Sequence, residues 1–205
     1  MSRKFMMVLL LATLTGCSSM SQKDSQRAEA IADARAKLSM GRCSMALARQ
    51  VVDVKEPALE QETAFLCLQQ GDLDAVKHLL SDYDSRHVDP PFPDYSAYLL
   101  ALTDFVRFES SAGDAQQRLA LGRQAHNHMA RFVRAYPESP YRHEIAPRLE
   151  QLHEGMARAE YQLAQNAIEA NDLETGESRL RYVVKTYPRS AAAKDAARWL
   201  EHNRR

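Results

Sequence analysis

The fold of this chain is decided by residues 171–188, which read NDLETGESRLRYVVKTYP. Asn171 suits the left-handed residue that ends one helix, and Asp172 suits the N-cap of the next helix. Gly176 is small enough to let a second helix approach closely, whereas Pro188 cannot continue a helix. The apolar positions between them recur at helical spacing and include the core-facing Leu180 and Val183. The stretch therefore predicts the second helix of a helix–turn–helix hairpin.

The same pattern recurs along the chain. Residues 40–43 (MGRC) and 70–73 (QGDL) each end one apolar-periodic segment and start another, and they lie 30 residues apart. This spacing is close to the period of about 34 residues in tetratricopeptide repeats. Residues 134–139 (RAYPES) and 185–190 (KTYPRS) are matching repeat endings. We therefore predict an all-α, tetratricopeptide-like solenoid of helical hairpins over residues 27–205, with about four repeat units plus a C-terminal helix.

Composition agrees with this fold class, since the chain has only seven glycines and is rich in good helix formers. Runs of alternating β-branched residues, which would indicate strands, are missing. Residues 84–93 are expected to form an extended connection. Pro147 is expected to delay the start of the helix at 141–169 or to kink it, and the helix is expected to break near Gly155. The expected helices are 26–40, 43–54, 57–70, 73–82, 94–109, 114–135, 141–169, 173–186 and 190–203.

The N-terminus has the pattern of a bacterial lipoprotein signal. A basic start precedes ten apolar-rich residues, a run too short to span a bilayer, and residues 14–17 read LTGC. This order resembles the lipobox, so we expect residues 1–16 to be removed and Cys17 to be acylated. Residues 17–26 would form the lipidated anchor and a polar tether. Because Ser18 and Ser19 follow Cys17 and no aspartate does, we expect an outer-membrane location facing the periplasm.

Charge excludes one class of partner. Without residues 1–16 the chain carries 25 basic and 27 acidic residues, a net charge of −2. Nucleic acid binding needs a concentrated basic surface, so it is not expected. Residues 18–113 hold 10 basic and 15 acidic residues, whereas residues 114–205 hold 15 and 12. The C-terminal half is therefore richer in arginine, which suits either a solvated helix face or a docking surface.

Two further cysteines, Cys43 and Cys67, remain in an oxidising compartment. In the repeat interpretation Cys43 starts one helix and Cys67 ends the next, so both lie at the same end of an antiparallel hairpin. A bridge there needs Cα atoms within about 7 Å. The alternative is that both are buried thiols that act as small apolar residues. We predict the disulfide.

An enzymatic function is not expected. His126 and His128 are the only local pair that suggests a metal, but positions i and i+2 of a helix point about 200° apart and cannot share an ion. The sequence holds no glycine-rich phosphate loop, nucleophile elbow or zinc-protease motif. We therefore predict no catalytic residue, no metal site and no cofactor.

From Glu56 onward the chain resembles the BamD-like lipoproteins of the β-barrel assembly machinery. The stretches that carry this resemblance are residues 61–80, 93–103, 132–140, 148–149 and 159–164 and the Tyr-Pro pair at 187–188. The resemblance implies a scaffold whose C-terminal repeats dock the barrel-forming subunit, with Arg179 in the helix that faces it. It further implies that the N-terminal repeats engage extended segments of unfolded outer-membrane proteins. Candidate groove residues are Phe65, Phe92, Tyr95 and Tyr98, although each could instead pack between helices.

The chain departs from that family in three places. An insertion between the helices at 94–109 and 114–135 is reduced to residues 109–113, the first repeat lacks an aromatic-proline ending, and a C-terminal repeat is missing. These departures leave two alternatives open. One is a pilotin or cell-envelope adaptor for a secretin or pilus system, and the other is a periplasmic peptide or ligand binder that acts alone.

Overall fold

The computed structural model describes residues 18–111 and 113–203, and within them every regular element is a helix. The helices are α1 Ser18–Ser39, α2 Met45–Val54, α3 Pro57–Gln69, α4 Leu73–Leu80, α5 Tyr83–Arg86, α6 Pro93–Ser110, α7 Ala115–Ala135, α8 Arg142–Glu169, α9 Leu173–Thr186 and α10 Ala191–His202. The predicted signal peptide and Cys17 lie outside the described residues.

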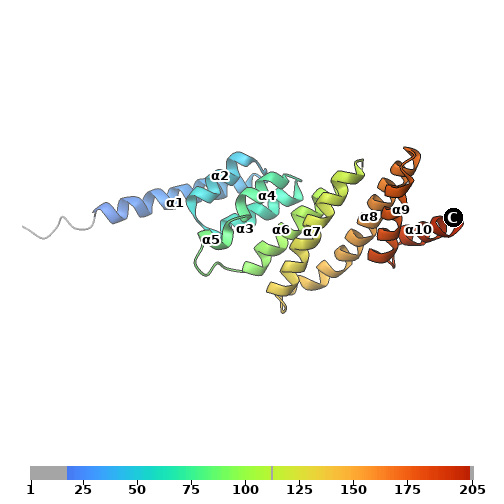
Figure 1. The fold of residues 1–205 in the computed structure, drawn as a ribbon. Helices are drawn as coiled ribbons and strands as arrows, with labels where there is room; N and C mark the ends of the chain where they lie inside the picture. Colours follow the sequence, from blue (N-terminus) through green and yellow to red (C-terminus); the bar gives the residue numbers. More distant parts are fainter. Residues whose placement is uncertain (1–17, 112, 204–205) are drawn as a thin grey trace, which may run out of the picture.

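The helices stack along one direction as antiparallel hairpins (Figure 1). The pairs are α1–α2, α3–α4, α6–α7 and α8–α9, and α10 packs on the last pair. Each pair also contacts the next one, through α4 with α6 and through α7 with α8. This arrangement confirms the predicted all-α solenoid of helical hairpins with a C-terminal helix.

The turns between helices have the predicted chemistry. Gly41, Gly71 and Asn171 take positive φ values of 65°, 76° and 64°, which end one helix in the left-handed conformation. Asp72 and Asp172 then cap the next helices, since their carboxylates accept from the N–H groups of Ala75 and Thr175, each at 3.1 Å. The predicted turn positions 70–73 and 170–173 are therefore confirmed at the level of single hydrogen bonds.

Two glycines permit close packing in the centre of the molecule. The fully buried ring of Phe108 on α6 lies where side chains at Gly122 of α7 and Gly155 of α8 would be. A Cβ atom placed on Gly155 would stand 2.4 Å from Phe108 Cζ, and one on Gly122 would stand 3.0 Å from Phe108 Cε2. Three helices thus meet around one aromatic ring.

The late start expected at Pro147 and the break expected near Gly155 do not occur in α8. The helix runs unbroken from Arg142 to Glu169, through both Pro147 and Gly155. Pro147 lies in the second turn, where its missing N–H removes only one hydrogen bond near the helix end. Gly155 stays helical because Phe108 packs against it, which offsets the helix preference that glycine lacks.

Two connections also differ from expectation. Helix α1 starts at Ser18, so the predicted polar tether is helical in its described part. The tether, SSMSQKDSQ, had indicated a linker by its polarity, but it continues the helix of the alanine- and arginine-rich residues 27–39 that follow it. Residues 84–93 are not extended throughout, because α5 (Tyr83–Arg86) forms one helical turn around the buried side chain of Tyr83. Among the described helices, none combines the length and apolar character needed to cross a membrane.

Gly176 provides a test of the close packing between α8 and α9. A Cβ atom there would lie 2.4 Å from Ile168 Cγ1 and 3.2 Å from the backbone oxygen of Ala164. We expect Gly176→Val to lower the free energy of unfolding by about 1–3 kcal/mol, as overpacking does elsewhere. Urea denaturation followed by circular dichroism measures this change.

Gly113→Ala is the matched control, because nothing lies within 4 Å of a Cβ atom at that position. Its unfolding free energy should stay within about 0.5 kcal/mol of the parent value. Equal stability of the Gly176→Val variant and this control would contradict the packing seen between α8 and α9.

Candidate protein-binding surfaces

The segment between α5 and α6, residues 87–92, is held at its start by a buried carboxylate. Glu60 of α3 is fully buried, and its two oxygens bind Arg86 Nη2 at 2.5 Å and His87 Nε2 at 2.8 Å. A buried carboxylate without partners would be strongly destabilising, so these contacts fix both residues in place. The polypeptide that leaves α5 is therefore tied to α3 before it enters the segment.

The next residue of α3 holds the end of the same segment. The amide nitrogen of Gln61 lies 2.7 Å from the carbonyl oxygen of Pro91, 3.0 Å from that of Phe92 and 2.8 Å from Ser96 Oγ. Gln61 is itself buried, so leaving its amide without these partners would be costly. Glu60 and Gln61, adjacent in the sequence, thus clamp the two ends of one segment, which we call the Phe92 loop (residues 87–92).

The Phe92 loop presents apolar side chains to solvent. Phe92 is 71% exposed and Val88 is fully exposed. Asp89 and Phe92 both adopt positive φ, at 52° and 48°, a region that non-glycine residues rarely occupy. The loop therefore has a defined, locally unfavourable backbone that displays an aromatic ring outside the core. It runs along the edge of the stack between α5 and α6 (Figure 1).

The four predicted aromatic groove residues have different surroundings. Phe65, one helical turn after Gln61 on α3, is 44% exposed, and Phe92 is more exposed still. Tyr95 is half-buried, with its ring centroid 5.4 Å from that of Tyr141. Phe65 and Phe92 are thus available to a partner, Tyr95 only in part.

Tyr98 was a candidate groove residue, but in the structure it packs between helices. It is 6% exposed, and its ring stacks on Tyr141 with the centroids 4.6 Å apart. Its hydroxyl donates to the carboxylate of Glu144 on α8. Burial raises the pKa of the Tyr98 hydroxyl, and the bond to Glu144 raises it further. Tyr98 therefore belongs to the core between α6 and α8.

The structure also has a recess that the sequence did not indicate, lined by residues of α4, α6 and α7. Its volume is about 510 Å³, and Leu80, Leu100 and Phe132 contribute apolar walls. Asp104 is almost fully buried there and accepts from Gln124 Nε2 at 2.7 Å and from His128 Nδ1. The only sequence signal was an aspartate within the apolar helix at 93–110. Both partners of Asp104 belong to α7, so the carboxylate joins α6 to α7 within the recess.

The two histidines of α7 diverge, as their spacing predicted. His126 stacks on His153 of α8 with the ring centroids 5.0 Å apart, whereas His128 binds Asp104 of α6. Burial lowers the pKa of His126, and the neighbouring His153 lowers it further. In the part of the chain that the structure describes, no three His, Cys, Asp or Glu side chains gather as a metal site would require.

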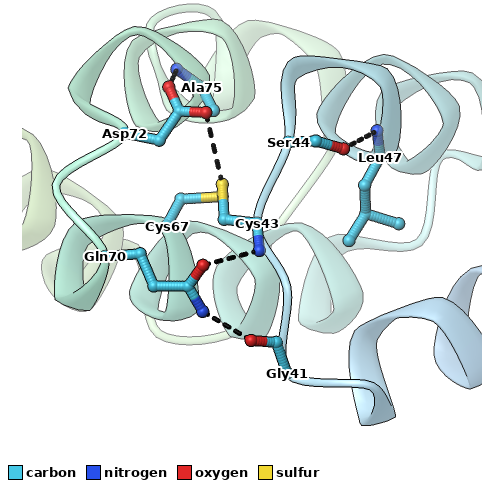
Figure 2. The surroundings of a disulfide bond; sticks show 8 residues. All are labelled: Gly41, Cys43, Ser44, Leu47, Cys67, Gln70, Asp72 and Ala75. Atoms are coloured by element: carbon cyan, nitrogen blue, oxygen red, sulfur yellow. Dashed lines mark hydrogen bonds between the residues drawn. A yellow bond between two sulfur atoms is a disulfide. The ribbon is translucent and has the colours of Figure 1, made fainter.

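The predicted disulfide between Cys43 and Cys67 is present, with the two Cα atoms 4.9 Å apart (Figure 2). Gln70 adds a second link beside it. Its Oε1 accepts from the N–H of Cys43 at 2.9 Å, and its Nε2 donates to the carbonyl of Gly41 at 2.6 Å. Asp72 Oδ2 lies 3.6 Å from Cys43 Sγ, but a bridged sulfur carries no hydrogen to donate. The turn after α1 is thereby fastened to the C-terminal end of α3.

Reduction of this bridge should destabilise the chain. The closed loop has a sequence separation of 24 residues, for which the loss of unfolded-state entropy corresponds to about 3 kcal/mol. We expect a reductant to lower the free energy of unfolding by about that amount, measured by urea denaturation. The Cys43→Ser/Cys67→Ser variant is the control, since reductant should not change its stability. Two free thiols at these positions in mass spectrometry of unreduced protein would contradict the bridge.

Comparison with known proteins identifies the family. Residues 23–205 match the YfiO family, which is described as outer membrane lipoprotein. The chain belongs to the YfiO family of outer membrane lipoproteins. This match confirms the predicted resemblance to the BamD-like lipoproteins and extends it to the first hairpin. A search of curated proteins found no significant match.

In this YfiO-family chain, Arg179 takes part in an internal ion-pair cluster. Its Nη1 lies 2.7 Å from Glu160 Oε2, and Arg123 Nη2 lies 3.0 Å from Glu160 Oε1. The carboxylate of Glu160 is buried, whereas 38% of the Arg179 side chain is exposed. One carboxylate on α8 thus joins α7 and α9. Arg179 has a structural contact whether or not it also meets a partner.

A double-mutant cycle on Glu160→Gln and Arg179→Ala measures this contact. Because Glu160 is buried and Arg179 is partly exposed, we expect a coupling energy of about 1 kcal/mol in the unfolding free energy. The exposed pair Arg181–Glu177, separated by one turn of α9, is the matched control. Its coupling should stay below about 0.5 kcal/mol. Equal coupling in the two cycles would show that Glu160 does not hold α9.

Proposed function

We propose that this lipoprotein is a non-enzymatic, periplasm-facing scaffold for the assembly of β-barrel outer-membrane proteins. The observation that carries the proposal is the family match over residues 23–205, on a stack of helical hairpins in which each hairpin contacts the next. Such stacks offer long, rigid surfaces to other polypeptides. We therefore propose that binding of other polypeptides, and not a chemical step, is what this stack does.

We propose that the chain is attached to the membrane by acylation of Cys17. Helix α1 would then link the lipid to the rest of the solenoid. Helix α1 has 22 residues, which corresponds to roughly 33 Å at the usual helical rise. It extends beyond α2 as a single helix (Figure 1). Arg27 fastens it to the end of α2, where it donates to the carbonyl oxygens of Val54 at 3.4 Å and Lys55 at 3.3 Å. A lipid at Cys17 would therefore be linked to the solenoid by a stiff helical spacer.

Two partner sites are proposed at opposite ends of the stack. The C-terminal hairpins would dock the barrel-forming subunit, with the exposed part of Arg179 at that surface. The N-terminal hairpins would engage extended segments of unfolded outer-membrane proteins through Phe65 and Phe92, with Tyr95 beside them. Their exposure supports this assignment, because large aromatic side chains that remain accessible are typical binding anchors.

Affinity purification of the tagged, full-length protein from chemically crosslinked outer membranes tests the proposal. We expect the barrel-forming subunit of the assembly machinery to be recovered. A Cys17→Ser variant serves as control, because it lacks the acceptor thiol and should be lost from the membrane fraction. Recovery of a secretin or pilus protein in place of the barrel-forming subunit would overturn the proposal in favour of a pilotin or adaptor role. Recovery of no protein partner at all would favour a solitary binder.

A further inference from the structure

Exposed carboxylates accompany the apolar residues of the Phe92 loop, within the loop, just before it in the sequence and on the neighbouring helix α3. Asp82, Asp84 and Asp89 are exposed, and so is Glu62, which precedes Phe65 on α3. Among the described residues, none of these four makes an ion pair within 4.0 Å. Arg86, the one arginine between Asp82 and Asp89, is bound to Glu60, whereas Asp84 also lines the recess that holds Lys77 and Arg131. The Phe92 loop therefore offers a partner two exposed apolar side chains together with exposed carboxylates.

We propose that the Phe92 loop is a preformed anchor for a polypeptide segment in which an aromatic or aliphatic residue is flanked by lysine or arginine. The inference rests on the proposed function only in assuming that this scaffold binds other polypeptides. It adds the chemistry of the segment that the N-terminal hairpins select.

The first support is the conformation of the loop. An aromatic side chain gains free energy in folding when it is buried, yet Phe92 is 71% exposed. Its positive φ is unfavourable for a residue with a Cβ atom, and Pro91 and Pro93 restrict the backbone on both sides. Core packing therefore does not account for the ring at this position. Binding does, because a ring that is already fixed loses little conformational entropy when a partner covers it.

The second support is the clamp formed by α3. The buried amide of Gln61 binds the carbonyl oxygens of Pro91 and Phe92, and the buried Glu60 binds the side chains of Arg86 and His87. Gln61 also binds the buried Ser96 of α6, so the same amide joins the loop to the contact between α3 and α6. The loop geometry is therefore imposed by the second hairpin and does not depend on the partner.

The third support is charge. Asp89 lies within the loop itself, and it and the other exposed carboxylates make no ion pair within 4.0 Å among the described residues. Such carboxylates favour a basic segment, since opposite charges at the rim of an interface speed association and select partners. The same carboxylates oppose insertion of Phe92 into a membrane surface, because bacterial lipid surfaces are anionic. A polypeptide with basic residues beside its apolar anchor satisfies both parts of this surface.

A second copy of the chain is the main competing occupant. Helix α9 carries the exposed Tyr182 with Arg181 beside it and Lys185 one turn away, which has the same chemistry as the proposed segment. A contact between that surface and the Phe92 loop of another copy would be head-to-tail and would continue into open chains. The experiment below separates this outcome from the proposal.

The test uses the lipidated full-length protein in detergent micelles and a fluorescent peptide with a phenylalanine-leucine centre and a lysine-arginine pair on each side. Fluorescence anisotropy should show saturable binding that weakens with added salt. We expect Phe92→Ser to lower the affinity about tenfold, the effect typical of a central anchor. Tyr182→Ser, which removes an exposed tyrosine at the other end of the chain, should leave the affinity unchanged.

Two further variants test the charge and the clamp separately. Replacing Asp82, Asp84 and Asp89 together by asparagine should lower the affinity about fivefold and flatten its salt dependence, and asparagine tolerates the positive φ at position 89. Gln61→Met keeps Phe92 but releases the two carbonyl oxygens, so we expect an affinity loss of about threefold with an unchanged peptide. Circular dichroism spectra must match the parent spectrum for each variant. For Gln61→Met, proton exchange of the backbone amides at residues 88 and 89 should accelerate.

Several results would overturn the inference. If a peptide with glutamate in place of the basic residues binds equally well, charge does not select the segment. If Phe92→Ser leaves the affinity unchanged, Phe92 is not the anchor. Anionic vesicles that bind in a manner abolished by Phe92→Ser would make a membrane the occupant, and self-association abolished by either Phe92→Ser or Tyr182→Ser would make it a second copy. Recovery of the barrel-forming subunit from membranes with failed peptide binding would sink this inference and leave the proposed function intact. Peptide binding without recovery of the barrel-forming subunit would support this inference and count against the proposed function.

Discussion

Each helical hairpin of this chain has apolar residues on both of its broad sides, and only the neighbouring hairpins can cover them. Helix α7 is covered by α6 on one side and α8 on the other, and α8 is covered in turn by α7 and α9. The ring of Phe108, enclosed by α7 and α8 at their glycines, shows how closely these layers approach. Because the main contacts join hairpins that are adjacent in the stack, each inner hairpin stabilises the two beside it. The rigidity of the scaffold follows from this constraint.

Apolar contact alone would permit helices to slide past one another, and buried carboxylates at the same seams oppose this. Glu60, Asp104 and Glu160 are each almost fully buried, and each binds two groups from neighbouring elements. A shift of one helical turn would leave such a carboxylate without partners in an apolar environment, at a cost of several kcal/mol. The carboxylates therefore select one register among the many that apolar packing accepts. In this chain the buried charges act on alignment more than on net stability.

Local chemistry was predictable from the sequence, and contacts across the fold were not. Asn171 and Asp172 fix a turn through their own backbone preferences, so the hairpin ends and the Cys43–Cys67 bridge could be derived from position and spacing. Tyr98 was assigned to a groove because an aromatic residue on a helix can face either way, and only the position of Tyr141 and Glu144 decides. The helix at Pro147 depends on the packing of its whole length, which outweighs one missing hydrogen bond. Glu60, Gln61 and the loop they hold lie 26 to 31 residues apart, a separation at which single-sequence patterns carry no pairing information.

The Phe92 loop is held by the same side chains that help to align the second and third hairpins. Glu60 and Gln61 face the seam between the second and third hairpins, and the same two side chains hold the loop that leaves that seam. The geometry offered to a partner is therefore set by the packing of α3 rather than by the loop sequence. Helix α3 is fastened in turn at its other end, where the disulfide at Cys67 and the amide of Gln70 join it to the turn after α1. A continuous set of contacts thus runs from the helix nearest the proposed lipid anchor, through α3, to the exposed ring of Phe92. A scaffold built in this way can present one side chain at a fixed position relative to the membrane, which a flexible tether and a mobile loop could not do.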